Sequence, residues 1–148
     1  MHANPLNERM IRFIKNHHIL TLATSYNNVP YCATCFYSYI EDENLFIITS
    51  DYDTKHVRDM QKQKRVSCAI ALETKIIGKI SGIQFTGTIT DLKDKDKASA
   101  RKSYLKRFPF AILKDTVLWS IEPDYIKMTD NRLGFGKKLY WYKSKEIL

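Results

Sequence analysis

Three short segments rich in apolar and β-forming residues follow one another early in the chain, with only a few polar residues between them. They cover residues 19–25, 31–40 and 45–50, and the connections are Tyr26-Asn27-Asn28 and residues 41–44. Asparagine and acidic residues are common in tight turns, and strands joined by short turns pair with their neighbours in the sequence. The pattern predicts an antiparallel meander, which restricts the chain to sheet-based architectures.

Helices are expected before and after this meander in the sequence. Asn4 followed by Pro5 is typical of a helix start, and the apolar stripe after it predicts a helix that ends near His17. Two more helices are predicted over residues 54–63 and 94–107. The apolar residues expected on the inner face of the last helix are Ala98, Leu105 and Phe108.

The remaining segments indicate more strands and a closed sheet. The further strands are predicted over residues 66–72, 79–92, 117–121, 125–129 and 139–142. Gly82 and Gly87 lie inside one of them, which is typical of a bulge or bend in a barrel strand. Closing the sheet on itself removes exposed edges from a small protein. We therefore expect an α+β fold, an antiparallel β-barrel with peripheral helices, in a single domain over residues 1–148.

The charge and composition of the chain restrict the classes of binding partner that are expected. The net charge of +8 favours a phosphorylated cofactor, nucleic acid or membrane surface as partner, although a basic surface also serves solubility alone. No apolar run is long enough for a membrane helix, and no secretion signal is recognised. The three cysteines cannot all pair with one another. These features predict a cytoplasmic protein with reduced thiols.

The junction of the third strand and the second helix carries the most chemical information. The strand ends at Ser50, and the helix begins near Thr54 with Lys55 in its first turn. A cation is unfavourable there by about 0.3–1 kcal/mol unless an anion binds. The pattern favours a phosphate site to which Thr49 adds a further hydroxyl. The simpler alternative is that Asp53 caps the helix and Lys55 extends into solvent.

Several motifs occur in a set order and spacing: Pro30-Tyr-Cys-Ala-Thr-Cys-Phe36, Leu45-Phe-Ile-Ile-Thr-Ser50, Thr54-Lys55, Gly82-Ile-Gln-Phe-Thr-Gly87 and Trp119-Ser-Ile-Glu-Pro-Asp-Tyr-Ile126. In this order they resemble the pyridoxamine 5′-phosphate oxidase-like split barrels that bind FMN. In detail they are most similar to the uncharacterised YhbP group of bacterial proteins in that superfamily. The resemblance covers nearly the whole chain.

The resemblance implies a homodimer with FMN in two clefts at the subunit interface, and a flavin-dependent oxidoreductase acting on an unidentified small molecule. The residues that it places along the flavin ring are Ala33, Thr34, Cys35 and Phe36. The residues that it places at the phosphate are Thr49, Ser50, Thr54 and Lys55. Gln84 is the polar side chain that it brings to the flavin from a later strand. No catalytic residue is implied.

The chain also departs from the family pattern. The oxidases proper carry Arg then Lys at the phosphate, where this chain has Thr54 and Lys55, and Ala33 stands where they carry an arginine. An Arg-x-His arrangement near the C-terminus is missing as well. We therefore do not expect oxidation of pyridoxamine 5′-phosphate. The nearby cations that would replace the missing charges are Arg58, Lys64 and Arg65.

Other motifs leave two alternative functions open. Cys32 and Cys35 form a C-x-x-C, but residues three apart on a strand face opposite sides, so neither a redox pair nor a metal site is expected. One alternative is a non-enzymatic barrel that binds flavin or another anion, or no cofactor at all. The less favoured alternative is a nucleic-acid-binding barrel that uses the basic segment over residues 101–107.

Overall fold

The computed structural model describes residues 4–113 and 117–144. The α-helices are α1 (Glu8–Asn16), α2 (Lys55–Lys62) and α3 (Asp94–Arg107). The strands are β1 (Ile19–Tyr26), β2 (Val29–Ile40), β3 (Leu45–Thr49), β4 (Arg65–Ala71), β5 (Ser81–Asp91), β6 (Leu118–Asp130) and β7 (Lys138–Tyr142). The short 3-10 segments are η1 (Glu41–Glu43), η2 (Ile77–Lys79), η3 (Pro109–Leu113) and η4 (Asn131–Leu133). None of the helices described here is long and apolar enough to cross a membrane.

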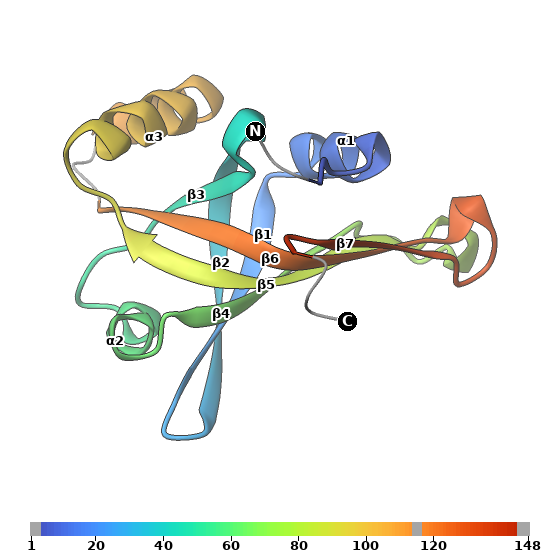
Figure 1. The fold of residues 1–148 in the computed structure, drawn as a ribbon, viewed down its shortest axis with the longest axis horizontal. Helices are drawn as coiled ribbons and strands as arrows, with labels where there is room; N and C mark the ends of the chain where they lie inside the picture. The colour runs from blue at the N-terminus through green and yellow to red at the C-terminus, as the bar shows by residue number, and fades with distance from the viewer. Residues whose placement is uncertain (1–3, 114–116, 145–148) are drawn as a thin grey trace.

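Six of these strands form a closed ring. They are hydrogen-bonded in the order β3-β2-β1-β4-β5-β6, and β6 returns to pair with β3. Every pairing is antiparallel, and β7 adds a further strand beside β6. Figure 1 shows α1 and α2 on opposite sides of the sheet, with the β1–β2 hairpin projecting beyond it. The predicted α+β barrel with peripheral helices is confirmed.

The β1–β2 hairpin turns at Asn27 and Asn28. Both residues have positive φ, 51° and 63°, and they lie between the paired residues Tyr26 and Val29. A two-residue turn of this kind matches the twist of the flanking strands, and asparagine tolerates the left-handed conformation better than most residues. The turn predicted from the two asparagines is therefore confirmed.

Strands β5 and β6 change register at a bulge. Between Thr86 and Gly87 the pairing shifts, so that Gly87 lies opposite Pro123 and Asp124 is the extra residue on β6. A Cβ on Gly87 would collide with the backbone carbonyl of Glu122, which is why a glycine is needed there. The bulge accommodates a proline without a ladder hydrogen bond. The two late strands predicted on either side of the Glu-Pro step are consequently one continuous strand.

The barrel interior holds the main core. Phe46 of β3 and Phe85 of β5 are both buried and stack with ring centroids 4.3 Å apart. A second, smaller cluster lies on the outside of the barrel beneath α3, and its buried members are Ile47, Ala100, Tyr104 and Leu118. Alternate residues of β3 therefore pack on both of its faces, which fixes that strand firmly next to the loop that follows it.

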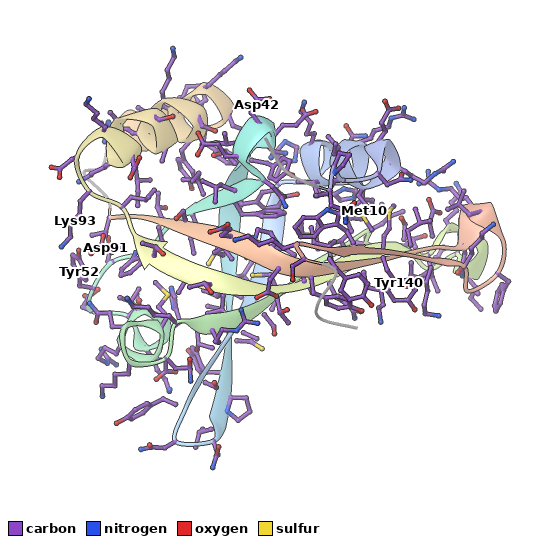
Figure 2. The ribbon with its side chains drawn as sticks, viewed as in Figure 1. Met10, Asp42, Tyr52, Asp91, Lys93 and Tyr140 are labelled. Carbon is purple, nitrogen blue, oxygen red and sulfur yellow. The ribbon has the colours of Figure 1, made fainter. Side chains whose placement is uncertain are left out.

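Helix α1 closes one side of the barrel, but it begins later than predicted. Asn7 occupies the N-cap position and accepts a hydrogen bond from the amide of Arg9 at 2.9 Å. Asn4 is used elsewhere: its side chain donates to the carbonyl of Tyr142, and its own carbonyl accepts from the indole of Trp141. The predicted start at Asn4-Pro5 is wrong because these contacts tie Asn4 to β7. The buried residues of α1 are Met10, Phe13 and Ile14. Of these, Met10 is labelled in Figure 2.

Helix α3 has the predicted bounds but a different inner face. Ala100 and Tyr104, which are one turn apart, are buried, whereas Ala98 is exposed. Leu105 and Phe108 are half-buried. The guanidinium of Arg107, the last residue in the helix, donates to backbone carbonyls of β2, of the last turn of α1 and of the α1–β1 connection. These bonds help to fix the rotation of α3. Such long-range anchors cannot be read from the helical spacing alone.

Candidate functional site

Among the residues that the structure describes, no side chain forms a capping hydrogen bond at the N-cap position of α2. Thr54 occupies the N-cap position, but its hydroxyl donates to the backbone carbonyl of Asp51 at 2.8 Å. The first turn contains no acidic residue, whereas α1 begins with Glu8 and is capped by Asn7. The first-turn amides of α2 are therefore available to an anion, which the helix dipole favours. The alternative in which Asp53 caps the helix is wrong, because Thr54 holds that position.

Lys55 is held against the protein surface. Its Nζ lies 2.7 Å from Oδ2 of Asp59 and 4.8 Å from the centre of the Tyr31 ring, and its side chain is 45% exposed. Asp59 also accepts a hydrogen bond from the hydroxyl of Thr24 at 3.2 Å. The hydrogen bond from Lys55 lowers the pKa of the Asp59 carboxyl, so the carboxylate is charged near neutral pH. An ammonium has three N–H donors, so this ion pair leaves others for a ligand.

His56 and Ser50 join the helix to the end of β3. Nε2 of His56 lies 2.8 Å from Oγ of Ser50, and the Ser50 carbonyl accepts from the indole of Trp119 at 3.0 Å. The side chain of Ser50 opposes the effect of burial on the pKa of the Cys35 thiol. Burial lowers the pKa of His56 and raises the pKa of Cys35. Near neutral pH the site therefore contains a neutral imidazole and a protonated thiol.

The four predicted phosphate residues are only partly brought together. Ser50, Thr54 and Lys55 lie around the start of α2. The hydroxyl of Thr49 instead donates to the hydroxyl of Tyr104 on α3 at 3.4 Å. Thr49 belongs to the outer face of β3, which α3 covers, and its side chain is therefore turned away from the other three.

The four predicted residues of β2 alternate between the two faces of the sheet. Ala33 and Cys35 pair with the buried residues of β1 and face the barrel interior. Thr34 and Phe36 face outward, and Phe36 is 55% exposed although its ring contacts that of Phe108. The two sulfurs of Cys32 and Cys35 lie on opposite faces as predicted, and both thiols are free.

Gln84 lies on the outer face of the barrel. It is exposed and pairs with Ala69 of β4, which in turn pairs with Thr21 of β1 and, through it, with Thr34 of β2. Strands are about 4.8 Å apart, so roughly 14 Å separate the ends of this row. Lys55 contacts Tyr31, whose side chain lies on the opposite face of the β1–β2 hairpin from that of Thr34. Within one chain Gln84 is therefore not beside Lys55.

Sequence reasoning missed Tyr31, Thr24 and Asp59 as neighbours of Lys55. The spacing of Lys55 and Asp59 is a signal for an ion pair on one face of a helix, whereas the contacts with the hairpin are long-range.

The structure also shows the surroundings of the three cations that were expected to replace the missing charges. Arg58 donates to a loop carbonyl at 2.6 Å, Arg65 forms an ion pair with Asp124, and Lys64 is exposed before β4.

Two grooves lie near these elements. One of about 340 Å³ runs along the base of the β1–β2 hairpin, and it includes Thr24, the hydrogen-bond partner of Asp59. Another of about 760 Å³ lies between α3 and η1, and cations such as Lys102 and acids such as Asp42 share its walls. The first of these grooves is linked to α2 by the hydrogen bond from Thr24 to Asp59, which is the ion-pair partner of Lys55.

Comparison with known proteins identifies the family. Residues 6–130 match the family model described as Pyridoxamine 5'-phosphate oxidase. The chain is also 39% identical over 132 residues to the UPF0306 protein plu4501 of Photorhabdus laumondii, which covers 89% of this chain and 92% of that protein. This chain belongs to the pyridoxamine 5′-phosphate oxidase family, in its UPF0306 group. The family assignment made from the order of the motifs is thus confirmed.

Solved structures of other proteins share the fold at low sequence identity. A heme binding protein from Mycobacterium smegmatis has a TM-score of 0.77 at 17% identity, covering 95% of this chain and 60% of that chain. A pyridoxamine 5'-phosphate oxidase-related, FMN binding protein from Nostoc punctiforme has a TM-score of 0.64 at 13% identity, covering 93% and 85%. The two neighbours bind different cofactors, so the fold by itself does not select one.

Proposed function

We propose that this protein binds FMN in clefts between two copies of the chain and acts as a flavin-dependent oxidoreductase on an unidentified small molecule. The uncapped start of α2, which carries Lys55 and His56, is the observation that supports the proposal most strongly. A phosphate there accepts hydrogen bonds from the first-turn amides and offsets the positive end of the helix. The same phosphate would remove the unfavourable effect of placing a lysine in that turn.

Lys55 and His56 would provide the charge-assisted part of phosphate binding. Hydrogen bonds to charged groups contribute about 1.5–3 kcal/mol each. A nearby phosphate also raises the pKa of His56, which opposes the lowering caused by its burial. The carboxylate of Asp59 acts in the opposite direction, because it already pairs with the ammonium. We therefore expect weaker FMN binding than in a site with two unpaired cations.

The outer face of β1, β4 and β5 is suited to a second copy of the chain. Its central residues have small side chains, and they are Thr21, Ala23, Ser67 and Ala69. Large apolar residues that are about half exposed lie on the same outer side of the sheet, namely Ile19, Phe36 and Tyr140. In Figure 2, Tyr140 projects from the sheet on the side away from Met10. Small residues with an apolar border allow two sheets to approach closely and exclude water.

A dimer also accounts for the separation of the predicted residues into two groups. Ser50, Thr54 and Lys55 lie around the start of α2, whereas Gln84 lies on the outer face of the barrel. In the proposed dimer, Gln84 of the second copy reaches the flavin whose phosphate is bound by α2 of the first. Each cleft then needs both copies of the chain.

The flavin, when bound, supplies hydride or electron transfer, and the residues of this chain position it and set the polarity around it. The amide of Gln84 has both donors and an acceptor for the polar edge of a flavin ring. The thiol of Cys35 faces the barrel interior, and it remains protonated near neutral pH because burial raises its pKa, so it places no negative charge behind this part of β2. These features fit a neutral pocket for the ring and a positive one for the phosphate.

The phosphate contribution is tested by comparing FMN with riboflavin, which lacks the phosphate. The apo protein is titrated with each flavin, and binding is followed by quenching of flavin fluorescence. Two charge-assisted hydrogen bonds predict that FMN binds about 100-fold more tightly or better. Equal affinities would contradict the assignment of α2, and binding of neither flavin would favour the cofactor-free alternative.

The identity of the cofactor is tested by denaturing the purified protein and analysing the released ligand. We expect FMN in the supernatant, with the absorbance of an oxidised flavin before denaturation. Release of heme instead would overturn the proposal in favour of the cofactor bound by the mycobacterial neighbour. Nucleic-acid binding that weakens steeply with added salt, in a protein that takes up no flavin, would favour the basic-surface alternative.

A further inference from the structure

A third pocket lies between α1 and the end of the barrel where β5 begins. Its volume is about 210 Å³, and its lining is dominated by cationic and polar side chains. Those that carry the argument are Arg9, Arg12, Asn16, His17, Ser81 and Arg132. Because α1 and α2 lie on opposite sides of the sheet, this pocket is separate from the start of α2 (Figure 1).

Ser81 is the buried polar group that points to a ligand. Its side chain lies on the inward face of β5, and the residue is only 3% exposed. Among the residues that the structure describes, its hydroxyl has no hydrogen-bond partner. Buried hydroxyls are nearly always paired in native proteins, so an unpaired one at a pocket wall needs an explanation. A bound acceptor within the pocket supplies that explanation.

A buried carboxylate positions two of the three arginines. Asp130 is 1% exposed and accepts from Nε and Nη2 of Arg132 at 3.0 and 3.1 Å. Nη1 of Arg9 lies 3.7 Å from the same carboxylate. In the described part of the chain Arg12 forms no ion pair. Three guanidinium groups thus line a pocket beside a single carboxylate, and each retains N–H donors for another anion.

The remaining walls make the pocket rigid and partly apolar. Nδ1 of His17 lies 2.8 Å from the carbonyl of Phe13, so Nδ1 carries the proton and Nε2 is left for another contact. The imidazole also stacks on the Phe13 ring with centroids 4.0 Å apart. Phe13 and Met128 exclude water from one side of the pocket, and a less polar wall strengthens charge-assisted hydrogen bonds.

We propose that this pocket binds a small anionic molecule through an oxyanion group, a carboxylate or a phosphate, held by Arg12, Arg132 and the hydroxyl of Ser81. The planar guanidinium fork matches both groups. The pocket is smaller than the roughly 300–1,000 Å³ typical of cofactor and drug-sized ligands, so it excludes FMN. A short dicarboxylate or a phosphorylated compound of a few carbons is the class that fits.

The test measures binding of inorganic phosphate and of succinate by calorimetry at constant ionic strength. We expect saturable one-to-one binding of at least one of them, and the tighter probe identifies the oxyanion. Arg12→Gln should weaken that binding about tenfold or more. Arg101→Gln on α3 makes the same change of charge away from the pocket, and it should leave the affinity within about twofold.

A second variant separates binding from folding. Ser81→Ala removes the unpaired hydroxyl, so it should raise the melting temperature of the free protein. The same variant should lower the affinity for the anion several-fold. The proposal is overturned if neither probe saturates below about 10 mM, a range in which weak sites are still measurable. It is also overturned if Arg12→Gln and Arg101→Gln have the same effect. FMN affinity should be unchanged in Arg12→Gln, so this proposal and the flavin proposal fail independently.

Discussion

Lys55 and Asp59 form an ion pair one turn apart on α2, with Nζ 2.7 Å from Oδ2. The pair lies at the candidate phosphate site, so the carboxylate that positions the ammonium also repels a phosphate. Thr24 donates a further hydrogen bond to the same carboxylate and ties the helix to β1. The affinity for FMN is therefore set by a balance between orientation of Lys55 and neutralisation of its charge.

Replacing the carboxylate tests this balance. Asp59→Asn keeps an acceptor for Thr24 but removes the negative charge, so we expect FMN to bind about two- to fivefold more tightly, as for a surface charge pair. The measurement is a fluorescence titration with FMN. The matched control is Asp96→Asn in the first turn of α3, which should leave the affinity unchanged. Weaker FMN binding by Asp59→Asn would show that orientation of the lysine matters more than its charge.

The pH dependence of stability follows from His56. Burial lowers its pKa below the ordinary value of about 6.5, so the unfolded chain takes up this proton at a higher pH than the folded one. The associated stability is fully present above about pH 6.5 and is lost as the pH falls toward the pKa of the folded state. Burial lowers the pKa of His18 as well, so it acts in the same direction.

Chemical unfolding of the apo protein at pH 7.5 and pH 5.5 checks this dependence. The wild-type protein should be less stable at the lower pH, and His56→Gln should show a smaller loss because the contribution of His56 is removed while that of His18 remains. Equal losses in both proteins would mean that His56 does not titrate differently on folding.

The bulge predicts a strongly position-dependent cost of adding a methyl group. Gly87→Ala places a Cβ against the carbonyl of Glu122, so we expect the free energy of unfolding to fall by about 1–3 kcal/mol. At Gly78 no atom of residues 4–113 or 117–144 is found within 4 Å of an added Cβ, and Gly78→Ala should change stability by no more than about 0.5 kcal/mol. Denaturant unfolding of the two variants measures the difference. A similar effect at both positions would contradict the close approach of β5 and β6.

The proposed dimer surface is tested by placing a charge at its centre. Ala69→Glu introduces a carboxylate among the small residues of β4, and burying it against a second copy would require an unpaired charge. Light scattering should give twice the chain mass of 17.4 kDa for the wild-type protein and a single chain mass for the variant. Ala98→Glu makes the same change on the exposed side of α3 and should remain dimeric. A monomeric wild-type protein would remove this face as an interface.

Much of the fold could be predicted because its signals are local. The left-handed pair Asn27-Asn28, the bulge at Gly87 and the bounds of α3 are each encoded within a few residues. The start of α1 could not be predicted in the same way. Asn4 and Asn7 are equally good caps on local grounds, and only the bonds between Asn4 and β7 decide between them.

The candidate site was less predictable for a different reason. The period of two along β2 separates Ala33 and Cys35 from Thr34 and Phe36, although the family pattern groups all four. The alternation was available in the sequence, but the contact that turns Thr49 toward α3 was not. The pocket beneath α1 joins residues as distant as Arg9 and Arg132, and no local pattern indicates it.

The central claim, that the start of α2 binds the phosphate of FMN, is tested most directly by the ratio of riboflavin and FMN dissociation constants in two lysine variants. Lys55→Gln removes the ammonium at the first residue of α2, and Lys62→Gln removes one at its last residue, where it lies over the Tyr26 ring. We predict that the ratio falls about tenfold or more in Lys55→Gln and stays at the wild-type value in Lys62→Gln. The same ratio in both variants would contradict the claim.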